Sequence, residues 1–309
     1  MERYDAIIIG AGVGGLLTGN FLARKGLRTV ILEQHSQPGG YVCGFRRQGF
    51  YFDGGDQSFG SSGIVFPVLK QLGLDRAVRF VRADYRWKTP WADFRVDSLA
   101  NVQEAVTAAF PESRFEIEAY FRDLRLCVRA VQAFGRHPNP LLNRGLSRYL
   151  AFARFMAEGA RAMSAVRAFT GLSGLALAER HFTNPVLIDF FGRFGYTGAA
   201  AISTAGAWGS WLYDYWYPLG GLQSFADLLA QSFADHGGEL RYRTRVGEIL
   251  LDPGPRAAGV RTETGERLTS RYVVAASDHR RLAQEMLPAV ALDPAWLEES
   301  GTAPVSDPL

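Results

Sequence analysis

Residues 4–33 read YDAIIIGAGVGGLLTGNFLARKGLRTVILE, and this stretch decides the fold. The branched apolar run at 4–9 predicts a strand that is buried on both faces of a parallel sheet. A helical pattern over 13–25 ends at Gly26, and residues 28–32 predict a second strand. The stretch therefore predicts a strand–helix–strand unit with a glycine-rich turn between the first strand and the helix.

The glycines of this turn, Gly10, Gly12, Gly14 and Gly15, have the spacing of a dinucleotide-binding turn. Gly10 permits the tight turn, Gly12 lets a pyrophosphate approach the backbone, and Gly15 allows close packing of helix against strand. The start of the helix offers free N–H groups and its positive dipole end to phosphates. Glu33, at the end of the second strand, is placed to accept hydrogen bonds from ribose hydroxyls. These residues predict a dinucleotide cofactor but do not choose between NAD and FAD.

The composition is that of a folded globular protein. Of its 309 residues, 47% are hydrophobic and 21% are charged, and the net charge of +3 gives no indication of nucleic-acid binding. Cys43 and Cys127 lack metal-ligand spacing, so we expect no metal site; two free thiols in a reducing cytoplasm are favoured over a disulfide. There is no signal-peptide pattern and no run of roughly 20 apolar residues, which predicts a cytoplasmic protein without a spanning helix.

The segment 33–56, EQHSQPGGYVCGFRRQGFYFDGGD, follows directly. Its first Gly–Gly pair permits close approach of the backbone to a ligand, and Gln48–Gly49 predicts a turn between two strands. An ordinary glycine-rich hairpin is the alternative interpretation. The segment resembles the second FAD-contact segment of the phytoene desaturase, carotenoid isomerase and retinol saturase family, within the amine-oxidase-like flavoproteins. The resemblance implies that the cofactor is FAD.

The resemblance also implies which residues of this segment lie beside FAD: Gly39, Gly40, Asp53, Gly54 and Gly55. The first two approach the diphosphate, and the last three lie near the flavin. Tyr41, which follows the Gly–Gly pair, is also expected beside the cofactor, although many relatives have an arginine at this position. Either Arg46 and Arg47 take over this charge contact or the contact is absent.

A second block extends the resemblance over residues 217–250, YPLGGLQSFADLLAQSFADHGGELRYRTRVGEIL. Its apolar spacing predicts a helix over 222–236 and a strand over 239–242. Residues 260–268 predict a hairpin around a glycine turn, and residues 271–277 predict a buried strand that returns towards the nucleotide. The whole resemblance covers roughly residues 4–290.

Three further contacts with FAD are implied by the resemblance alone. The backbone at Val246 contacts the adenine in relatives, although a plain core valine is an equal alternative. Ser277 and Asp278 match a family position just beyond the FAD.

The middle of the chain predicts a different kind of structure. Residues 85–96 predict a hairpin, and residues 101–182 lack strand signals and look helical. Between Arg114 and Arg167 there are ten arginines and four acidic residues. A basic helical region with an apolar face is typical of contact with a membrane surface; a solvated arginine face over an ordinary core is the alternative. The apolar side chains predicted to share one helical face are Phe152, Phe155, Met156, Met163, Val166 and Phe169.

Six aromatic residues precede the second block: Trp208, Trp211, Tyr213, Tyr215, Trp216 and Tyr217. They either line an apolar tunnel that ends at the flavin or pack as an ordinary core. His181 ends a predicted helix, where we expect a surface or capping role and not catalysis.

Together these patterns predict an α/β fold: a discontinuous Rossmann-type FAD-binding domain with an inserted, largely helical substrate domain. The expected boundaries are 1–84 for the first part of the FAD-binding domain, 85–216 for the insert, 217–290 for the return and 291–309 for a tail. Because a flavin itself carries the hydride chemistry, no catalytic residue is predicted.

The function implied by the resemblance is FAD-dependent oxidation or reduction of a hydrophobic, polyene or lipid-like substrate. Desaturation, saturation and isomerisation of C=C bonds stay open. Family members usually continue well beyond the strand at 272–277, so the chain is a compact variant, a truncated product or one part of a split enzyme with a partner chain. The alternative function is a non-catalytic FAD- or lipid-binding subunit that needs such a partner. A plain NAD-dependent enzyme is the third interpretation, and the segment 39–55 argues against it.

Overall fold

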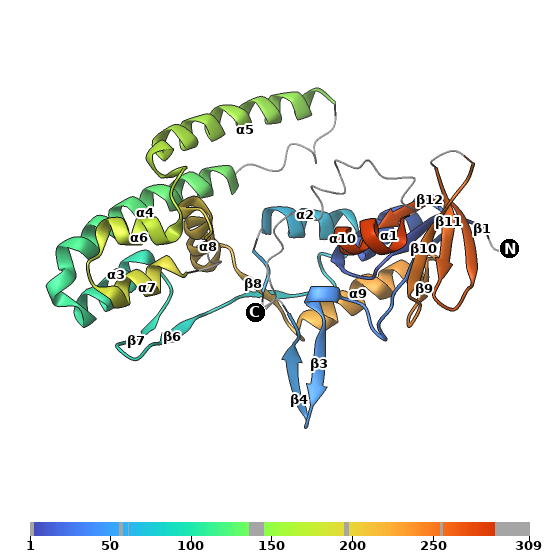
Figure 1. The fold of residues 1–309 in the computed structure, drawn as a ribbon, viewed down its shortest axis with the longest axis horizontal. Coiled ribbons are helices and arrows are strands. Elements are labelled where there is room, and N and C mark those ends of the chain that lie inside the picture. Colours follow the sequence, from blue (N-terminus) through green and yellow to red (C-terminus); the bar gives the residue numbers. More distant parts are fainter. Residues whose placement is uncertain are drawn as a thin grey trace. The chain divides into compact units, whose positions relative to one another are not determined.

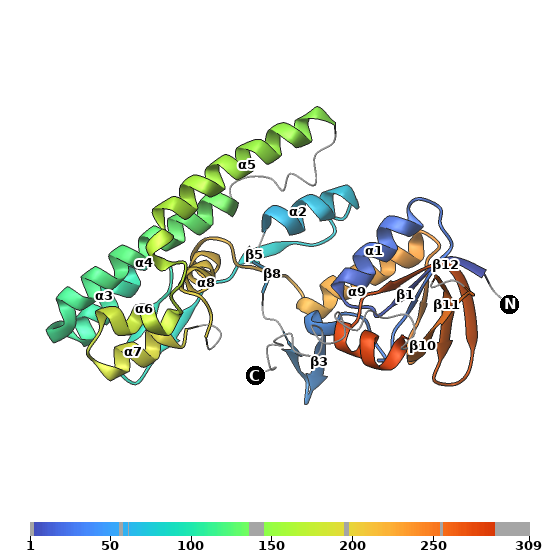
Figure 2. The same ribbon diagram turned by 45° about the horizontal axis from the view of Figure 1, so that its top comes forward.

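The computed structural model describes residues 3–55, 58–60, 62–135, 145–194, 198–253 and 256–287. The chain divides into two compact units (Figures 1 and 2). The first unit comprises residues 1–57, 72–80 and 217–309, and the second comprises residues 58–71 and 81–216. The boundary expected at residue 84 had assigned residues 58–71 and 81–84 to the first unit, whereas their contacts group them with the second.

A six-stranded sheet forms the centre of the first unit, in the order β10-β11-β12-β1-β2-β9. The strands are β1 (Arg3–Ile9), β2 (Thr29–Leu32), β9 (Glu239–Arg241), β10 (Val246–Leu251), β11 (Ala257–Thr262) and β12 (Arg267–Ala275). β12, β1, β2 and β9 run parallel to one another, and β10 and β11 add an antiparallel edge. Ile7, Ile8 and Ile31 are fully buried, as expected for strands covered on both faces. The strand–helix–strand unit predicted from residues 4–33 is thus confirmed.

Two helices of this unit, α1 (Val13–Ala23) and α9 (Leu222–Asp235), lie side by side against the sheet (Figures 1 and 2). They approach closely because Gly19 of α1 has no side chain. A Cβ at that position would lie 2.8 Å from Ile31 Cδ1 and 3.1 Å from the ring of Phe233. Asn20 also donates its amide hydrogen to the carbonyl oxygen of Leu229 at 2.8 Å. The helix predicted over 222–236 is confirmed by α9.

The first unit also contains β3 (Gly44–Arg47), a 3-10 turn at Gly40–Val42, β4 (Phe50–Asp53), the short helix α10 (His279–Arg281) and a π-helical turn at Leu282–Met286. β3 and β4 form the predicted hairpin around Gln48–Gly49. The prediction of a buried strand over 271–277 is wrong in part. β12 begins at Arg267, and Arg271 and Tyr272 are exposed. Because neighbouring residues of a strand point to opposite faces of the sheet, β12 is open to solvent on both faces at this point.

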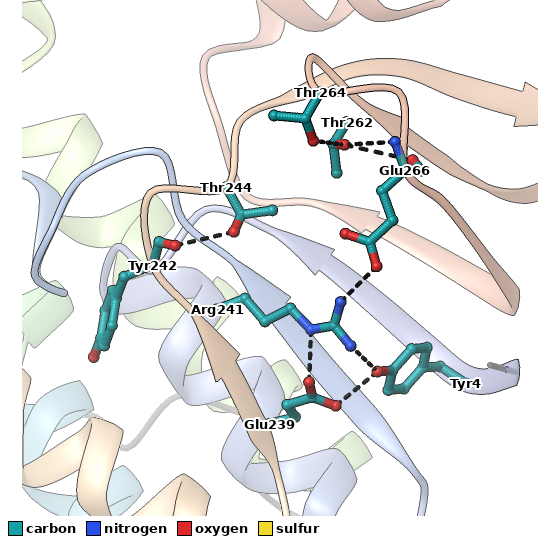
Figure 3. Close-up of polar contacts among 8 residues, drawn as sticks. All are labelled: Tyr4, Glu239, Arg241, Tyr242, Thr244, Thr262, Thr264 and Glu266. Atoms are coloured by element: carbon teal, nitrogen blue, oxygen red, sulfur yellow. Dashed lines mark hydrogen bonds and ion pairs between the residues drawn. The ribbon is translucent and has the colours of Figure 1, made fainter.

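A polar network joins β1, β9 and the turn between β11 and β12, as Figure 3 shows. Arg241 Nε donates to Glu239 Oε1 at 2.6 Å, and its other nitrogens donate to Glu266 Oε1 and to the Tyr4 hydroxyl, each at 2.9 Å. The Tyr4 hydroxyl donates to Glu239 Oε2 at 2.6 Å. Burial alone raises the pKa of Glu239, but the hydrogen bonds from Tyr4 and Arg241 outweigh it, so the pKa lies below its usual 4.5.

This lowered pKa predicts acid sensitivity of the first unit. A carboxyl whose pKa is lower in the folded state stabilises the fold above its unfolded pKa, and this contribution is lost as pH falls through the folded pKa. Urea unfolding between about pH 6 and about pH 3 is therefore expected to show a steeper loss of unfolding free energy for the wild type than for Glu239→Gln. Glu118→Gln, which removes an exposed i,i+4 pair with Arg114, is the control. Equal slopes for wild type and Glu239→Gln would contradict the expectation.

The second unit is mainly helical. Its helices are α2 (Ser62–Gln71), α3 (Leu99–Ala109), α4 (Arg114–Gly135), α5 (Leu146–Ala165), α6 (Gly174–His181), α7 (Pro185–Gly192) and α8 (Ala201–Tyr213). Its strands β6 (Arg86–Lys88) and β7 (Asp93–Arg95) form the hairpin predicted over 85–96. Two further strands, β5 (Phe80–Arg82) and β8 (Trp216–Pro218), pair with each other, and the division between the units falls within both of them. The helical character predicted for residues 101–182 is confirmed over the described residues of that range.

An aromatic core holds the second unit together. Trp208 is fully buried and stacks on Phe194 with ring centroids 4.4 Å apart. Trp87 packs against both Trp208 and Trp211 at 5.4 Å. This packing supports the core interpretation of Trp208 and Trp211, while a tunnel stays a prediction.

His181 differs from its expected surface or capping role. Its side chain is only 11% exposed, and its Nε2 lies 2.9 Å from Asp123 Oδ2. The prediction was wrong because α6 packs against α4, and the sequence does not show that contact across 58 positions.

Candidate dinucleotide-binding site

The turn from β1 into α1 has two positions at which only glycine fits. Gly10 has a φ of +99°, and a Cβ there would lie 2.8 Å from the carbonyl oxygen of Ala276. A Cβ on Gly15 would overlap the carbonyl oxygen of Gly10. Protein atoms leave no room for a side chain at either position. These two glycines therefore allow the helix to pack closely against the strand.

The other two glycines of the turn face open space. A Cβ on Gly12 or Gly14 would meet no atom within 4 Å. Gly12 is the N-cap of α1, and no side chain caps this helix end. The first N–H groups of a helix have no partner within the helix, so this end offers donors and positive dipole charge to a ligand. The arrangement fits a diphosphate in the space beside Gly12 and Gly14.

The second segment closes on this turn. Gly39 donates its N–H to the carbonyl oxygen of Ala11 at 2.8 Å, and Gly12 and Gly39 form an isolated parallel bridge. A Cβ on Gly40 would lie 3.3 Å from Gly12 Cα. The structure thus brings the predicted pair Gly39–Gly40 against the predicted diphosphate turn, although the two are far apart in the printed sequence.

Glu33 lies beside the same turn. Its side chain is buried at the end of β2, and Oε2 accepts the N–H of Ala11 at 2.7 Å. Oε1 accepts the N–H of His35 at 2.9 Å. The carboxylate therefore points to the turn that it was predicted to serve, and its contact with a ribose stays a prediction.

The turn after β4 packs against the residues that follow the Gly–Gly pair. Gly54 donates its N–H to the carbonyl oxygen of Cys43 at 2.8 Å, and a Cβ on Gly55 would lie only 2.5 Å from the carbonyl oxygen of Tyr41. The Tyr41 side chain itself is exposed, as are Arg46 and Arg47. That Arg46 and Arg47 take over the charge contact with a cofactor phosphate, or that this contact is absent, stays a prediction.

Of the three remaining residues predicted to lie beside FAD, the structure brings Ser277 to the turn but gives the side chains of Val246 and Asp278 other partners. Val246 is buried in the core of the first unit, so its side chain packs as a plain core valine and only its backbone is left for an adenine. Ala276 donates its N–H to the carbonyl oxygen of Ile9 at 2.9 Å, which carries Ser277 to the edge of the turn. Asp278 instead caps α10, and the hydrogen bonds from the N–H groups of Arg280 and Arg281 lower its pKa.

Sequence reasoning missed the contacts of three side chains of this region: Tyr51, Gln223 and Tyr217, of which the last was predicted only to line a tunnel or pack in a core. Tyr51 and Tyr217 bind Asp53, and Gln223 binds the backbone of Gly44. No spacing rule marks the two long-range contacts, because Tyr217 lies 164 positions from Asp53 and Gln223 lies 179 positions from Gly44; Tyr51 lies only two positions from Asp53. Within the described part of the chain, no group of three His, Cys, Asp or Glu side chains is placed to hold a metal ion, and Cys43 and Cys127 are free thiols.

Comparison with known proteins agrees with this geometry. A family model described as flavin containing amine oxidoreductase matches residues 13–305. The chain is 26% identical over 295 residues to chloroplastic prolycopene isomerase of Arabidopsis thaliana, which covers 88% of this chain and 47% of that protein. It is 26% identical over 301 residues to phytoene desaturase of Cercospora nicotianae, which covers 93% of this chain and 47% of that protein. The chain thus spans about half the length of these curated relatives.

The crystal structure of an oxidoreductase from Methanosarcina mazei shares the fold, with a TM-score of 0.61 and 17% sequence identity over 97% of this chain and 65% of that chain. The family match covers nearly the whole sequence, and the open glycine turn fits the nucleotide that such a family carries. The chain therefore belongs to the flavin containing amine oxidoreductase family, and its cofactor is FAD.

Proposed function

We propose that the protein containing this chain is an FAD-dependent oxidoreductase that acts on the C=C bonds of a hydrophobic polyene or lipid-like substrate. The observation that carries the proposal is the glycine turn, in which Gly12 and Gly14 leave open space before an uncapped helix. The similarity to a prolycopene isomerase and a phytoene desaturase supports the substrate class. Because the match spans about half of each relative, desaturation, saturation and isomerisation all stay within the proposal.

The described residues contribute binding and orientation. The first N–H groups of α1 and the backbone at Gly39–Gly40 would hold the diphosphate. Glu33, which accepts the N–H of Ala11, would accept the ribose hydroxyls. When bound, FAD supplies hydride transfer to or from carbon, which the protein side chains do not perform themselves.

The proposal is tested on purified protein. We expect it to be yellow, to release FAD on denaturation and to change the absorption spectrum of a poly-cis carotenoid or phytoene presented in liposomes. A colourless protein that binds NAD but no flavin would contradict the whole proposal. Bound FAD without turnover of any polyene, with or without an artificial electron acceptor, would contradict the substrate class only.

A second candidate is a non-catalytic subunit that holds FAD or lipid for a partner chain. If the chain is catalytic, we expect the chain alone to reduce its flavin or to turn over a polyene. Turnover only after addition of a second chain would favour the subunit.

We also propose that α5 contacts a membrane surface. Its outward side is apolar: Leu146, Tyr149, Leu150, Phe152, Met156 and Met163 are all exposed. At 100° per residue these side chains fall on one continuous side of the helix. The prediction of one shared helical face is wrong in part. Val166 and Phe169 lie beyond the end of α5 and are buried, whereas Phe152, Met156 and Met163 are exposed. Among the described helices, none has both the length and the apolar character needed to span a bilayer.

The charges at the edges of this side favour an anionic bilayer as the partner. Arg154 and Arg161 lie along one edge and Arg148 along the other, and all three are exposed. An apolar side between arginines is the arrangement of helices that lie in the plane of the interface. Each arginine near an anionic surface contributes about 1 kcal/mol at physiological ionic strength. The occupant that these side chains fit is therefore a bilayer with anionic headgroups.

Liposome co-sedimentation tests this surface. We expect wild type to bind phosphatidylglycerol vesicles at least ~10-fold more tightly than phosphatidylcholine vesicles, and the double variant Phe152→Ser, Met156→Ser to lose most of this binding. Phe115→Ser, which removes an aromatic side chain that is 83% exposed on α4, is the control and should bind as wild type. Unchanged binding of the double variant would contradict the proposal. Dissociation of a dimer by the same variant, without any lipid effect, would identify a second copy as the occupant.

A further inference from the structure

The carboxylate of Asp53 is shared by donors from three elements. Its Oδ1 accepts the hydroxyl of Tyr51 at 2.8 Å and the N–H of Leu222, the first residue of α9, at 3.0 Å. Its Oδ2 accepts the hydroxyl of Tyr217 at 2.9 Å. The carboxylate thus binds the hairpin, the strand β8 and the start of α9 at once. These bonds engage both oxygens of a side chain that was expected beside the flavin.

Tyr51 extends this connection to the hairpin and α9. Its hydroxyl accepts the N–H of Gln223 at 3.0 Å, and its ring leaves no room for a Cβ on Gly44 or Gly221. The Gln223 side chain accepts the N–H of Gly44 at 2.9 Å and donates to the carbonyl oxygen of Pro38 at 3.1 Å. The first turn of α9 is therefore fixed to both ends of the segment that begins before Gly39 and ends at Asp53.

From this segment the contacts continue to the diphosphate turn. Gly54 binds the carbonyl oxygen of Cys43, and Gly39 binds that of Ala11. Tyr217 is the first residue of the returning part of the first unit. Burial and the hydrogen bond to Asp53 raise the pKa of Tyr217 to about 12, so its hydroxyl remains a donor at neutral pH.

We propose that Asp53 is a positioning residue, which fixes Gly39–Gly40 over the diphosphate turn by fastening the hairpin to the start of α9, and that its side chain is not a ligand of FAD. The proposal rests on the FAD-dependent function proposed above. A carboxylate that accepts three donors holds them better than any apolar replacement, and removing it leaves buried or half-buried donors unpaired. Misplacement of the Gly–Gly pair then weakens the binding of the cofactor.

The experiment compares FAD dissociation constants of Asp53→Ala and Asp53→Asn. An asparagine has nearly the same shape; its oxygen can accept Leu222 and Tyr51, and its amide can donate to the Tyr217 hydroxyl. We expect Asp53→Ala to weaken FAD binding at least ~10-fold and Asp53→Asn to stay within ~3-fold of wild type. Bound FAD in Asp53→Asn should keep the absorption spectrum and the midpoint potential of wild type.

A shifted midpoint potential in Asp53→Asn would show that the negative charge acts on the flavin directly, which overturns the proposal, as would wild-type affinity in Asp53→Ala. Asp235→Ala, on the exposed end of the same helix, is the control for α9. If Asp53→Ala fails to fold, Tyr217→Phe takes its place, with weaker FAD binding expected and wild-type affinity overturning the proposal. A wild type that binds no FAD would instead contradict the proposed function.

Discussion

Gly12→Asp is expected to weaken FAD binding by at least ~100-fold while the apoprotein stays as stable as wild type. Gly12 has an ordinary φ of −68°, and a Cβ there meets no protein atom within 4 Å. An aspartate is a good N-cap and gains from the helix dipole, so the helix is stabilised by a few tenths of a kcal/mol or is unchanged. The same carboxylate occupies the space and repels the charge of the diphosphate.

The two effects are measured separately, by fluorescence titration with FAD and by thermal unfolding without it. Ser98→Asp is a matched control, because Ser98 is the N-cap of α3 in the second unit and its side chain accepts the N–H of Asn101 at 3.0 Å. This variant adds the same charge at a helix start and should bind FAD as wild type. Wild-type affinity in Gly12→Asp would place the diphosphate elsewhere.

Gly15→Ala is expected to lower the unfolding free energy by about 3 kcal/mol or more. The added Cβ overlaps the carbonyl oxygen of Gly10, which is backbone and cannot rotate away. Helix α1 must then move away from β1. This movement disturbs the packing at the centre of the first unit. Gly14→Ala is the matched variant, since its Cβ meets no atom within 4 Å and alanine favours a helix by about 0.5–1 kcal/mol.

Urea unfolding followed by far-ultraviolet circular dichroism measures this difference. We expect Gly14→Ala to unfold at the same or a higher urea concentration than wild type and Gly15→Ala at a clearly lower one. Equal urea midpoints for the two variants would contradict the close packing of α1 against β1 at Gly15.

The sequence predicted those parts of the molecule that short-range patterns determine. The strand, turn and helix from residue 4 to residue 25, the hairpin at Gln48–Gly49 and the helix α9 follow from apolar spacing and glycine positions. The closing of Gly39–Gly40 on the turn was available only through resemblance, because no local rule links residue 39 to residue 11.

The contacts that sequence reasoning missed are made by side chains distant in the chain. Asp53 was expected beside the flavin, but its partners at Tyr217 and Leu222 lie more than 160 positions away. His181 was expected at the surface, and its partner Asp123 lies on another helix. The outward apolar side of α5 was also misassigned in part, since periodicity shows that a face exists but not which side meets the core.

A crystal structure of the protein with FAD tests the central claim most directly. The diphosphate should lie against the N–H groups at the start of α1, between Gly12 and the backbone of Gly40, with the Glu33 carboxylate on the adenosine ribose. A flavin bound away from this turn, with Glu33 still accepting only the N–H groups of Ala11 and His35, would contradict it.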